Sequence, residues 1–303
     1  MSLFPYSDRI SRMSDIIIRD LATHEEYTAA ESIQRTTWGM PDLEIIPAHA
    51  LHAMQHSGAA LLGAFDGPRL VGFTFGVLST QDTPNRVDQV AAARLKMYSV
   101  IAGVLPEYQH QNVGYRLKMA QRDFCLRIGV RLITWTYDPL ESRNGLFNIG
   151  KLGAVCHNYL RHFHGDMSGL NAGLQTDRFE VEWWVTSHRA EARATRKWRP
   201  LRREGLLAGG ALLVNEATFD AAGLPVPPPN YVSRPSNLML VEIPANFQAI
   251  KRQEFALAQR WRAHTRDIFE GMFDSGFLVT DFVTQEDESG RPRSYYLLTH
   301  GDS

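Results

Sequence analysis

The chain has 303 residues, of which 44% are hydrophobic and 21% are charged, and its formal net charge is -1. This composition is typical of a globular protein with one large domain or two modest ones. The near-neutral charge argues against bulk electrostatic binding to nucleic acid or to an acidic membrane surface. No apolar run reaches the roughly 18 residues that a membrane-spanning helix needs, and the first residues lack the apolar core of a secretory signal. We therefore expect a cytoplasmic protein.

The cysteine and histidine content argues against a disulfide framework and against a metal site. The chain has two cysteines, Cys125 and Cys156, and no Cys/His spacing typical of zinc. Cys125 is interpreted as a small buried hydrophobic residue. His162 and His164 alternate in a way that would place both on one face of a strand, but a third ligand is missing, so no metal is expected.

Strand and helix patterns alternate through the first half of the chain. Residues 1–14 are expected to form a disordered leader. The helix at 22–37 has Thr23 as a suitable N-cap, with Glu26 three residues on. Two apolar strands flank the turn at 66–69, as in a hairpin. The patterns predict, in order, a strand at 15–19, helices at 22–37 and 47–56, and strands at 59–65, 70–78 and 94–105.

Residues 98–129 carry the most informative pattern. An apolar run meets a turn led by Pro106, and a polar loop at 109–114 then opens an amphipathic helix. Because the first turn of a helix presents free backbone N–H groups and the positive end of the helix dipole, an anion could bind there. The spacing predicts that the buried stripe of this helix consists of Leu117, Ala120, Phe124 and Ile128, with Arg116, Lys118, Gln121 and Arg122 elsewhere.

Further elements follow this helix. A strand is expected at 131–137, a helix at 141–152 closed by Gly153, and a strand at 179–185. In the pair Trp183-Trp184, one side chain must face outward. Residues 188–203 are strongly basic; we favour a solvated linker or helix face over a nucleic-acid or protein adaptor, and a role in holding an adenosine 3′-phosphate stays open.

The last part of the chain regains order after a proline-rich segment at 225–229, which is interpreted as a stiff connector. A strand is expected at 238–243, one long helix at 247–273, and strands at 277–283 and 295–299. The organisation predicted is a leader at 1–14, a first domain at 15–186, a basic and Pro-rich connector at 187–236, and a C-terminal α/β extension at 237–303.

The segment at 98–129 resembles the acyl-CoA-binding core of the GNAT superfamily of N-acyltransferases. The family's loop has the form Gln/Arg-x-x-Gly-x-Gly/Ala. Gln109 and Gly114 match it, whereas Asn112 stands where the middle Gly is usual and His110 where a Gly is common. Asn tolerates positive φ better than most residues, so the loop can still form.

The resemblance implies a fold and a place for the cofactor. The order of elements from 15 to 186 is the one that the GNAT fold requires: α/β (α+β), with a mixed, mostly antiparallel central sheet flanked by helices, here plus a C-terminal βαββ extension. Acyl-CoA would be the co-substrate, with pantetheine along the strand edge and the thioester oxygen near the backbone of Val104 and Leu105. The pyrophosphate would lie over the loop and the start of the helix, at Gln109, His110, Gln111, Asn112, Val113, Gly114, Tyr115 and Arg116.

The segments 165–167 and 171–179 narrow the resemblance to a group of longer GNAT-like proteins that carry such an extension. Some of these are linked with N-acylation of amino acids, including succinylation. A substrate carboxylate would then be bound by Arg178, next to Asp177, or by Arg143, although surface ion pairs would explain these residues equally well.

Candidates for acid and base catalysis come partly from the resemblance. The family's proton donor to sulfur is a Tyr, but that position holds Ile149 here, so Tyr159 or His157 would replace it, or the thiolate leaves unaided. For the general base, Tyr98 aligns with a Glu found in some members, Asp138 ends the strand at 131–137, and His157 is the residue type best suited to neutral pH. A structural histidine and a turn-starting Asp138 are the alternatives.

These observations predict an acyl-CoA-dependent N-acyltransferase that transfers an acetyl or succinyl group to a small amine, most simply an amino acid. The amine would attack directly within a ternary complex, without a covalent enzyme intermediate. The alternative is a non-catalytic acyl-CoA-binding or regulatory protein. Nucleic acid and membrane are not expected as partners, and a homodimer is among the oligomeric states that the sequence leaves open.

Overall fold

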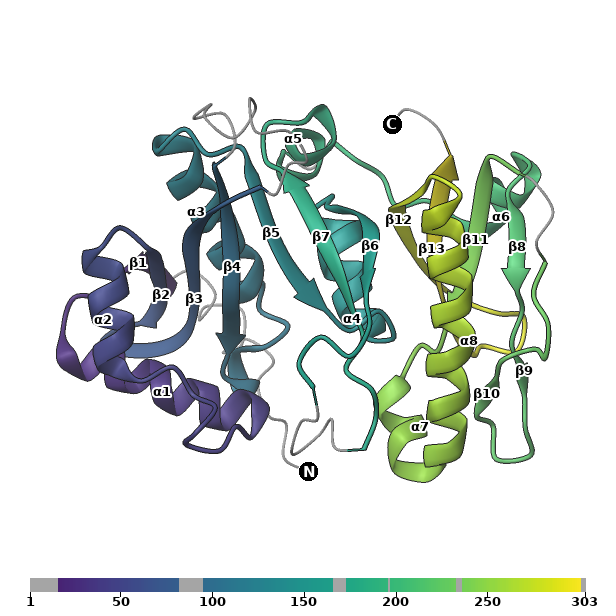
Figure 1. Ribbon diagram of the computed structural model, residues 1–303, viewed down its shortest axis with the longest axis horizontal. Helices are drawn as coiled ribbons and strands as arrows, with labels where there is room; N and C mark the ends of the chain where they lie inside the picture. The colour runs from purple at the N-terminus through teal and green to yellow at the C-terminus, as the bar shows by residue number, and fades with distance from the viewer. Residues whose placement is uncertain (1–15, 82–94, 166–172, 196, 233–235, 301–303) are drawn as a thin grey trace, which may run out of the picture. The chain divides into compact units, whose positions relative to one another are not determined.

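The computed structural model describes residues 16–81, 95–165, 173–195, 197–232 and 236–300 (Figure 1). The leader expected at 1–14 lies outside these ranges, and so do residues 166–167 and 171–172 of the segments that narrowed the resemblance. Contacts divide the chain into two compact units, which meet in sequence between Thr134 and Trp135. Unit 1 holds the described residues up to 134, and unit 2 holds those from 135 onward.

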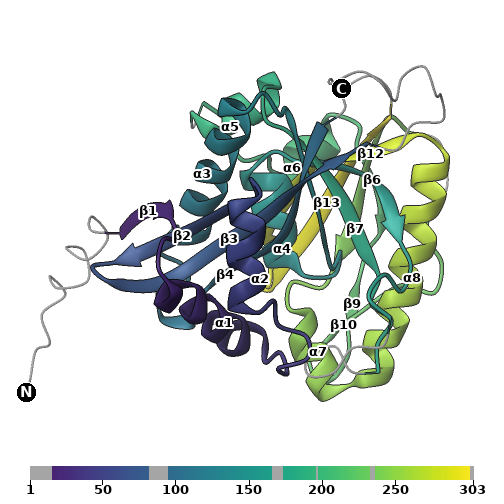
Figure 2. The same ribbon diagram turned by 60° about the vertical axis from the view of Figure 1, so that its left-hand side comes forward.

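Unit 1 is an antiparallel sheet, in the order β1-β2-β3-β4, with helices on both faces (Figures 1 and 2). The first residues of β5 add a short parallel pairing with β4. Its elements are β1 (Ile16–Asp20), α1 (His24–Trp38), α2 (Ala48–His56), β2 (Ala60–Asp66), β3 (Arg69–Thr80), β4 (Leu95–Val104), a 3-10 turn (Pro106–Tyr108), α3 (Val113–Arg127) and the start of β5 (Leu132–Tyr137).

Two neighbouring residues of β4 show which helix covers which face of this sheet. A side chain at Gly103 would run into the Trp38 ring of α1, whereas the Val104 side chain lies near Gly114 of α3. Successive strand residues point to opposite faces, so α1 and α3 lie on opposite sides. The core between them includes the fully buried rings of Phe65, Phe73 and Phe75.

In unit 2 the strand order continues from β5 as β7-β6-β12-β13-β11-β8, in which β8 runs parallel to β11 and the neighbours from β7 to β11 are antiparallel. The helix α8 packs on this sheet through an aromatic cluster in which the Phe179 and Phe269 rings lie 4.7 Å apart. Its elements are α4 (Ser142–Gly145), the π-helical turn η5 (Leu146–Lys151), β6 (Val155–Leu160), β7 (Arg178–Trp184), α5 (His188–Ala194), α6 (Arg203–Ala208), β8 (Leu212–Asn215), β9 (Thr218–Phe219), β10 (Pro225–Val226), β11 (Leu238–Ile243), α7 (Phe247–Gln253), α8 (Phe255–Asp274), β12 (Phe277–Glu286) and β13 (Pro292–His300).

The predicted fold class is confirmed: both units are mixed α/β structures with mostly antiparallel sheets flanked by helices, and the tail has the strand–helix–strand–strand order expected. Thr23 caps α1 by accepting a hydrogen bond from the Glu26 amide. Gly153 follows η5 with a φ of 80°, as its C-terminal position predicted. Trp183 is fully buried while Trp184 is 41% exposed, as the alternation of a strand requires.

Several element predictions are wrong. The expected helix at 247–273 is two helices, because the extended backbone of Glu254 (φ -147°) separates α7 from α8. His162 and His164 lie in a turn, not on a strand, and His162 has a φ of 48°. The proline-rich segment is not a plain connector, since Pro225 and Val226 pair with β9. The strands β6 and β8 and the helix α6 had no counterpart in the prediction.

Within the described residues, no helix is both long enough and apolar enough to cross a lipid bilayer.

Candidate functional site

The predicted anion-binding loop of unit 1 has the backbone shape that a tight phosphate-binding turn needs. His110 and Asn112 both adopt the left-handed conformation, with φ values of 66° and 60°. Asn112 stands where the pattern has its middle Gly and His110 where a Gly is common, and Asn and His are among the non-glycine residues that accept this conformation. The helix α3 begins directly afterwards, at Val113, so its positive end faces the loop.

Side chains hold this loop in place from both ends. Gln109 Nε2 donates to the Val104 carbonyl (3.1 Å), and Gln111 Nε2 donates to the Glu107 carbonyl (2.9 Å). The Tyr108 hydroxyl donates to Asp66 at the β2–β3 turn (2.6 Å). The loop is therefore preorganised. Of the other residues predicted to hold the cofactor, Arg116 donates instead to the Ile16 carbonyl of β1 (2.5 Å), while Gly114 and Tyr115 are half-buried in the first turn of α3.

Beside the loop, β4 has an open edge that begins in the middle of the strand. Met97 of β4 pairs with Ile133 of β5, and Tyr98 pairs with Thr134. The pairing does not extend further along the described strands. On its other side β4 stays paired with β3, but the register shifts there. Gly76 pairs with Ser99 and Phe75 with Ile101, which leaves Val100 as the extra residue of a β-bulge.

The backbone at Val104 and Leu105, predicted to lie near the thioester oxygen, is partly engaged within the sheet. The Leu105 amide already donates to the Val71 carbonyl at 2.9 Å, so it is not available for a ligand. Val104 ends β4, and its side chain packs toward α3. Tyr98, a candidate base, is half-buried at the last residue that pairs with β5.

The stripe that hydropathy predicted for α3 is only partly the buried face: Leu117 is fully buried as predicted, but the face is rotated from the predicted one. Ile128 is 45% exposed, whereas Lys118 and Gln121 are buried. The Lys118 Nζ atom lies 2.7 Å from Ser99 Oγ and 3.1 Å from Gln121 Oε1. Burial lowers the pKa of Lys118 to about 7. Cys125 is fully buried as expected, and burial raises the pKa of its thiol to about 12, which makes it a poor nucleophile.

In unit 2, Asp138 is part of a buried ion-pair cluster. Arg262 of α8 donates to both of its carboxylate oxygens, at 2.9 and 2.5 Å, and the Leu140 amide donates to one of them at 2.9 Å. Arg178 Nη1 lies 3.8 Å from the same carboxylate. Burial alone would raise the pKa of Asp138, but the arginines outweigh it, so the pKa lies below its ordinary value. Asp138 is therefore a weak base. The hydrogen bond that its carboxylate accepts from the Leu140 amide fits the alternative interpretation, in which Asp138 starts a turn.

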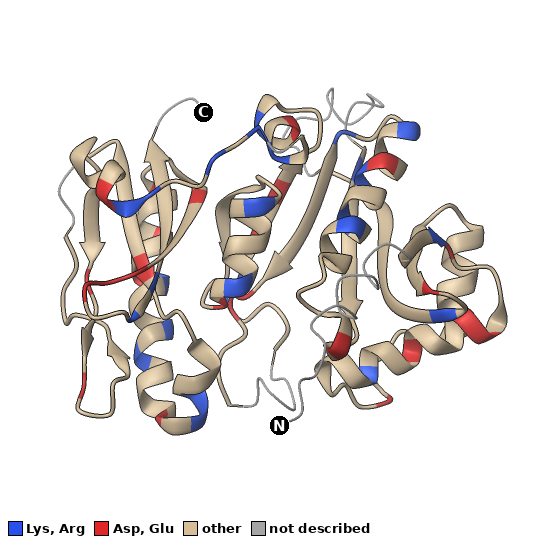
Figure 3. Cartoon of the chain, turned by 180° about the vertical axis from the view of Figure 1, so that it is seen from behind, with Lys and Arg blue, Asp and Glu red and all other residues tan. Residues whose placement is uncertain are grey.

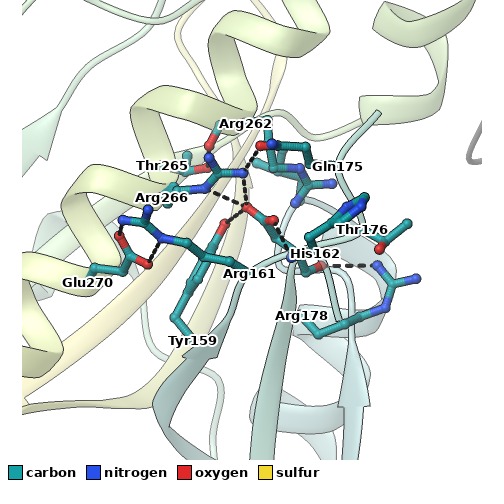
Figure 4. Close-up of polar contacts among 12 residues, drawn as sticks. Tyr159, Arg161, His162, Gln175, Thr176, Arg178, Arg262, Thr265, Arg266 and Glu270 are labelled. Carbon is teal, nitrogen blue, oxygen red and sulfur yellow. Dashed lines mark hydrogen bonds and ion pairs between the residues drawn. The ribbon is translucent and has the colours of Figure 1, made fainter. Parts of the chain in front are cut away.

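Asp177 organises a second polar cluster, which Figure 4 shows. Its carboxylate accepts hydrogen bonds from the Tyr159 hydroxyl (2.8 Å), the His162 amide (3.0 Å) and Arg266 Nε (2.8 Å). Burial is the main reason that the pKa of Tyr159 lies well above its ordinary value. Because its proton is committed to Asp177, Tyr159 is not a free proton donor to a leaving thiolate.

The two arginines predicted to bind a substrate carboxylate have different surroundings. Arg178 is 8% exposed, and its Nη1 donates to the Asp177 carbonyl at 3.0 Å (Figure 4). Burial lowers the pKa of Arg178. Arg143 is exposed in α4. Arg178 and Arg262 both interact with the carboxylate of Asp138, and the Asp177 carboxylate also contributes favourably to both arginines.

The remaining predicted catalytic positions lie on β6 and η5. His157 is exposed at a register shift of β6, between Cys156 and Asn158. Ile149, which stands in place of the family's tyrosine, is fully buried in η5. Sequence reasoning missed Ser99, Lys118, Arg262 and Arg266. No local pattern could have found the arginines, because their partners lie about 90 to 120 residues away in sequence.

The basic segment at 188–203 is not simply solvated. Arg193 is 5% exposed, donates to Asp281 of β12 at 2.8 Å, and stacks its guanidinium 3.3 Å from the Trp198 ring centre. Glu191 stands among the basic residues of α5, and Figure 3 shows acidic and basic residues interspersed elsewhere on the face that it presents.

No protein family model and no curated protein sequence matches the chain, but solved structures do. The ribosomal-protein-S18-alanine N-acetyltransferase of Escherichia coli is 15% identical over 57% of this chain and 95% of its own, with a TM-score of 0.43. A putative acetyltransferase of the GNAT family from Desulfovibrio desulfuricans is 16% identical over 56% and 99%, with a TM-score of 0.44. An N-acetyltransferase from Staphylococcus aureus Mu50 is 14% identical over 57% and 100%, with a TM-score of 0.44. Such identities carry no information about substrate.

Proposed function

We propose that the protein is a GNAT-type enzyme that transfers an acyl group from acyl-CoA to an amine. One observation carries this proposal: within unit 1, a preorganised loop with two left-handed residues leads into α3, directly beside the open edge of β4. The loop and the start of α3 would hold the diphosphate of coenzyme A. The open strand edge would hold the pantetheine chain through backbone hydrogen bonds, as an added strand would.

The reaction needs hydrogen-bond donors and a proton acceptor rather than a nucleophile. The amine nitrogen attacks the thioester carbonyl carbon, the C–S bond breaks, and the thiolate leaves with the bonding electrons. A backbone N–H of the bulge segment at 100–102 would stabilise the oxygen as negative charge develops on it. Because Ile149 replaces the family's tyrosine and Tyr159 is engaged by Asp177, the thiolate would leave without a tyrosine proton donor.

His157 is the candidate base that the structure leaves accessible, since Asp138 is neutralised by arginines. We expect His157→Ala to lower kcat about 10²-fold, in the range typical of a general base, while the KM for acyl-CoA changes less than about threefold. His162→Ala serves as the matched control, because His162 contributes its backbone amide to Asp177. Steady-state assays of both variants test this role. An unchanged kcat in His157→Ala would show that His157 is not the general base.

The acceptor would be a small amine with a carboxylate, most simply an amino acid, and the acyl group acetyl or succinyl. The arginine-rich cluster around Asp138 supports an anionic acceptor, with Arg178 as the residue that contacts its carboxylate and Arg143 as the exposed alternative. A bidentate contact between guanidinium and carboxylate would orient the amine.

A non-catalytic acyl-CoA-binding protein is the second candidate, and one observation favours it. The position of the family's proton donor holds a fully buried isoleucine, and Tyr159, a nearby tyrosine, is hydrogen-bonded to a buried carboxylate. Such a protein would use the same loop and strand edge to bind acyl-CoA without turnover.

Two measurements separate these functions. We expect acetyl-CoA or succinyl-CoA to raise the midpoint of thermal unfolding, because a ligand that binds the folded state stabilises it. Release of free thiol should then rise above background with amino acids and not with the matching amines that lack a carboxylate. A thermal shift without thiol release for any amine would favour the binding protein, and the absence of both would contradict the proposal.

A further inference from the structure

Three buried polar side chains meet where α3 packs against the strands β3 and β4 of unit 1. Lys118 Nζ donates to Ser99 Oγ at 2.7 Å and to Gln121 Oε1 at 3.1 Å. All three residues are at most 5% exposed. The chain makes room for them at Gly76, where a Cβ atom would lie 2.8 Å from Gln121 Nε2 and 2.9 Å from Met97 Sδ. The strands β3 and β4 and the helix α3 thus all contribute to this cluster.

A buried lysine is costly, and packing alone does not explain it. Lysine is among the residues least often fully buried, because its ammonium group loses hydration. A methionine or leucine at 118 would fill the same space without that cost. An apolar residue at 118 would make neither the hydrogen bond to Gln121 on the same helix nor the one to Ser99, which joins the helix to β4.

Ser99 lies where β4 stops pairing with β5 and where its bulge begins. It is the last residue before the bulge at Val100, and the residue before it is the last that pairs with β5. Before the bulge, Ser99 points toward α3; beyond it, Val104 points toward α3 and Gly103 toward α1. The bulge therefore reverses the alternation of the strand, and the contact with Lys118 fixes where the reversal occurs.

We propose that Lys118, through Ser99, sets the backbone geometry of the β4 bulge and is thereby a positioning residue for acyl transfer. The second half of this statement rests on the proposed function. The same helix that carries Lys118 begins at the anion-binding loop, so one buried hydrogen bond links that helix to the strand segment whose N–H groups would face the thioester. Small displacements of such donors strongly lower the rate of the chemical step.

The charge of Lys118 gives this arrangement a pH dependence. Below pH 7 the ammonium group donates to both Ser99 and Gln121, as in the structure. Above pH 7 the neutral amine loses its charge-assisted hydrogen bonds. Among the described residues, the Cys125 thiol of α3 is a titratable group coupled to it, and this thiol stays neutral in this range. The cluster residues on β3 and β4, Gly76 and Ser99, do not titrate.

The first test is NMR spectroscopy of the free protein, which needs no acyl-CoA. We expect the amide shift of Val100 to show an inflection near pH 7 that is lost in Lys118→Met. In Ser99→Ala, the side-chain carbon of Lys118 should still titrate while the Val100 amide no longer follows. A Val100 amide that is insensitive to pH in the unsubstituted protein, or that titrates identically in both variants, would overturn the proposal.

The second test is turnover, with Arg127→Met as the control because Arg127 is an exposed cation in the last turn of the same helix. We expect Lys118→Met to lower kcat about tenfold below pH 7 with little change in KM for acyl-CoA, and the gap to the unsubstituted protein to narrow above pH 8. The variant should also unfold at a higher temperature near pH 6, because it removes a buried charge, so unfolding would not explain the loss. If the ratio of kcat in Lys118→Met to kcat in the unsubstituted protein does not change with pH, Lys118 acts only through packing. Absence of turnover in every protein, with the NMR coupling intact, would refute the proposed function while the bulge geometry stands.

Discussion

Gly114→Trp should abolish acyl-CoA binding, with an affinity at least about 100-fold weaker, while the fold stays intact. Gly114 lies in the first turn of α3, and a Cβ added there would meet only Val104 Cγ2, at 3.9 Å. Its φ is not in the left-handed range, so a side chain causes no backbone strain. An indole would instead fill the space in front of the N–H groups of the helix start, where the diphosphate would lie. Isothermal titration calorimetry with acetyl-CoA measures the effect.

Gly114→Ala is the matched control, because a methyl group fits that space with ordinary van der Waals contact. We expect it to bind acetyl-CoA within about fivefold of the unsubstituted protein. Circular dichroism and the unfolding midpoint of Gly114→Trp without ligand verify the fold. Normal binding of acetyl-CoA by Gly114→Trp would show that the loop at 109–114 is not the diphosphate site.

Short-range patterns predicted the parts of the fold that local chemistry determines. Thr23 begins a helix because its hydroxyl accepts from an amide three residues on, and the hairpin turn at 66–69 needs the left-handed Gly67. The loop at 109–114 belongs to the same class. Its backbone shape depends on residues that accept positive φ, and Asn112 supplied that without glycine.

The buried face of α3 could not be predicted, because hydropathy assigns Lys118 and Gln121 to solvent. Their burial depends on Ser99 and Gly76, which lie on two strands some 20 to 40 residues earlier in the chain. Only the tertiary structure brings the Ser99 hydroxyl and Gly76, which has no side chain, next to Lys118 and Gln121 in the core. Polar residues on a buried helix face violate the binary pattern, and such violations are expected at functional sites.

The environment of Asp138 was beyond prediction for a similar reason. Its partner Arg262 lies in α8, and nothing near Asp138 in sequence indicates a bidentate arginine. Without that partner, a carboxylate at the end of a strand is a reasonable base. With it, the pKa falls and the group becomes a structural anion. Tyr159 changes role in the same way when its hydroxyl donates a hydrogen bond to Asp177.

Asp138→Ala should destabilise unit 2 by about 3–5 kcal/mol, the range for removing one partner of a buried ion pair. The variant leaves Arg262, which is 3% exposed, and Arg178, which is 8% exposed, without their shared carboxylate. Urea unfolding at pH 7 measures the loss. Glu216→Ala is the control, because the Glu216 side chain is 59% exposed in its pair with Arg203, and such pairs contribute about 1 kcal/mol or less.

The pH dependence of this loss identifies the charge as its cause. The pKa of Asp138 is lower in the folded chain than in the unfolded one, where it is about 3.9. Its contribution to the free energy of unfolding is therefore fully present above pH 5 and declines as the pH falls through the folded value. The difference between Asp138→Ala and the unsubstituted protein should shrink below about pH 4. The double variant Asp138→Ala/Arg262→Met should recover part of the stability at pH 7, because it removes the uncompensated guanidinium as well. Equal losses at pH 7 and pH 3 would indicate that Asp138 stabilises the turn through its hydrogen bond to Leu140 alone.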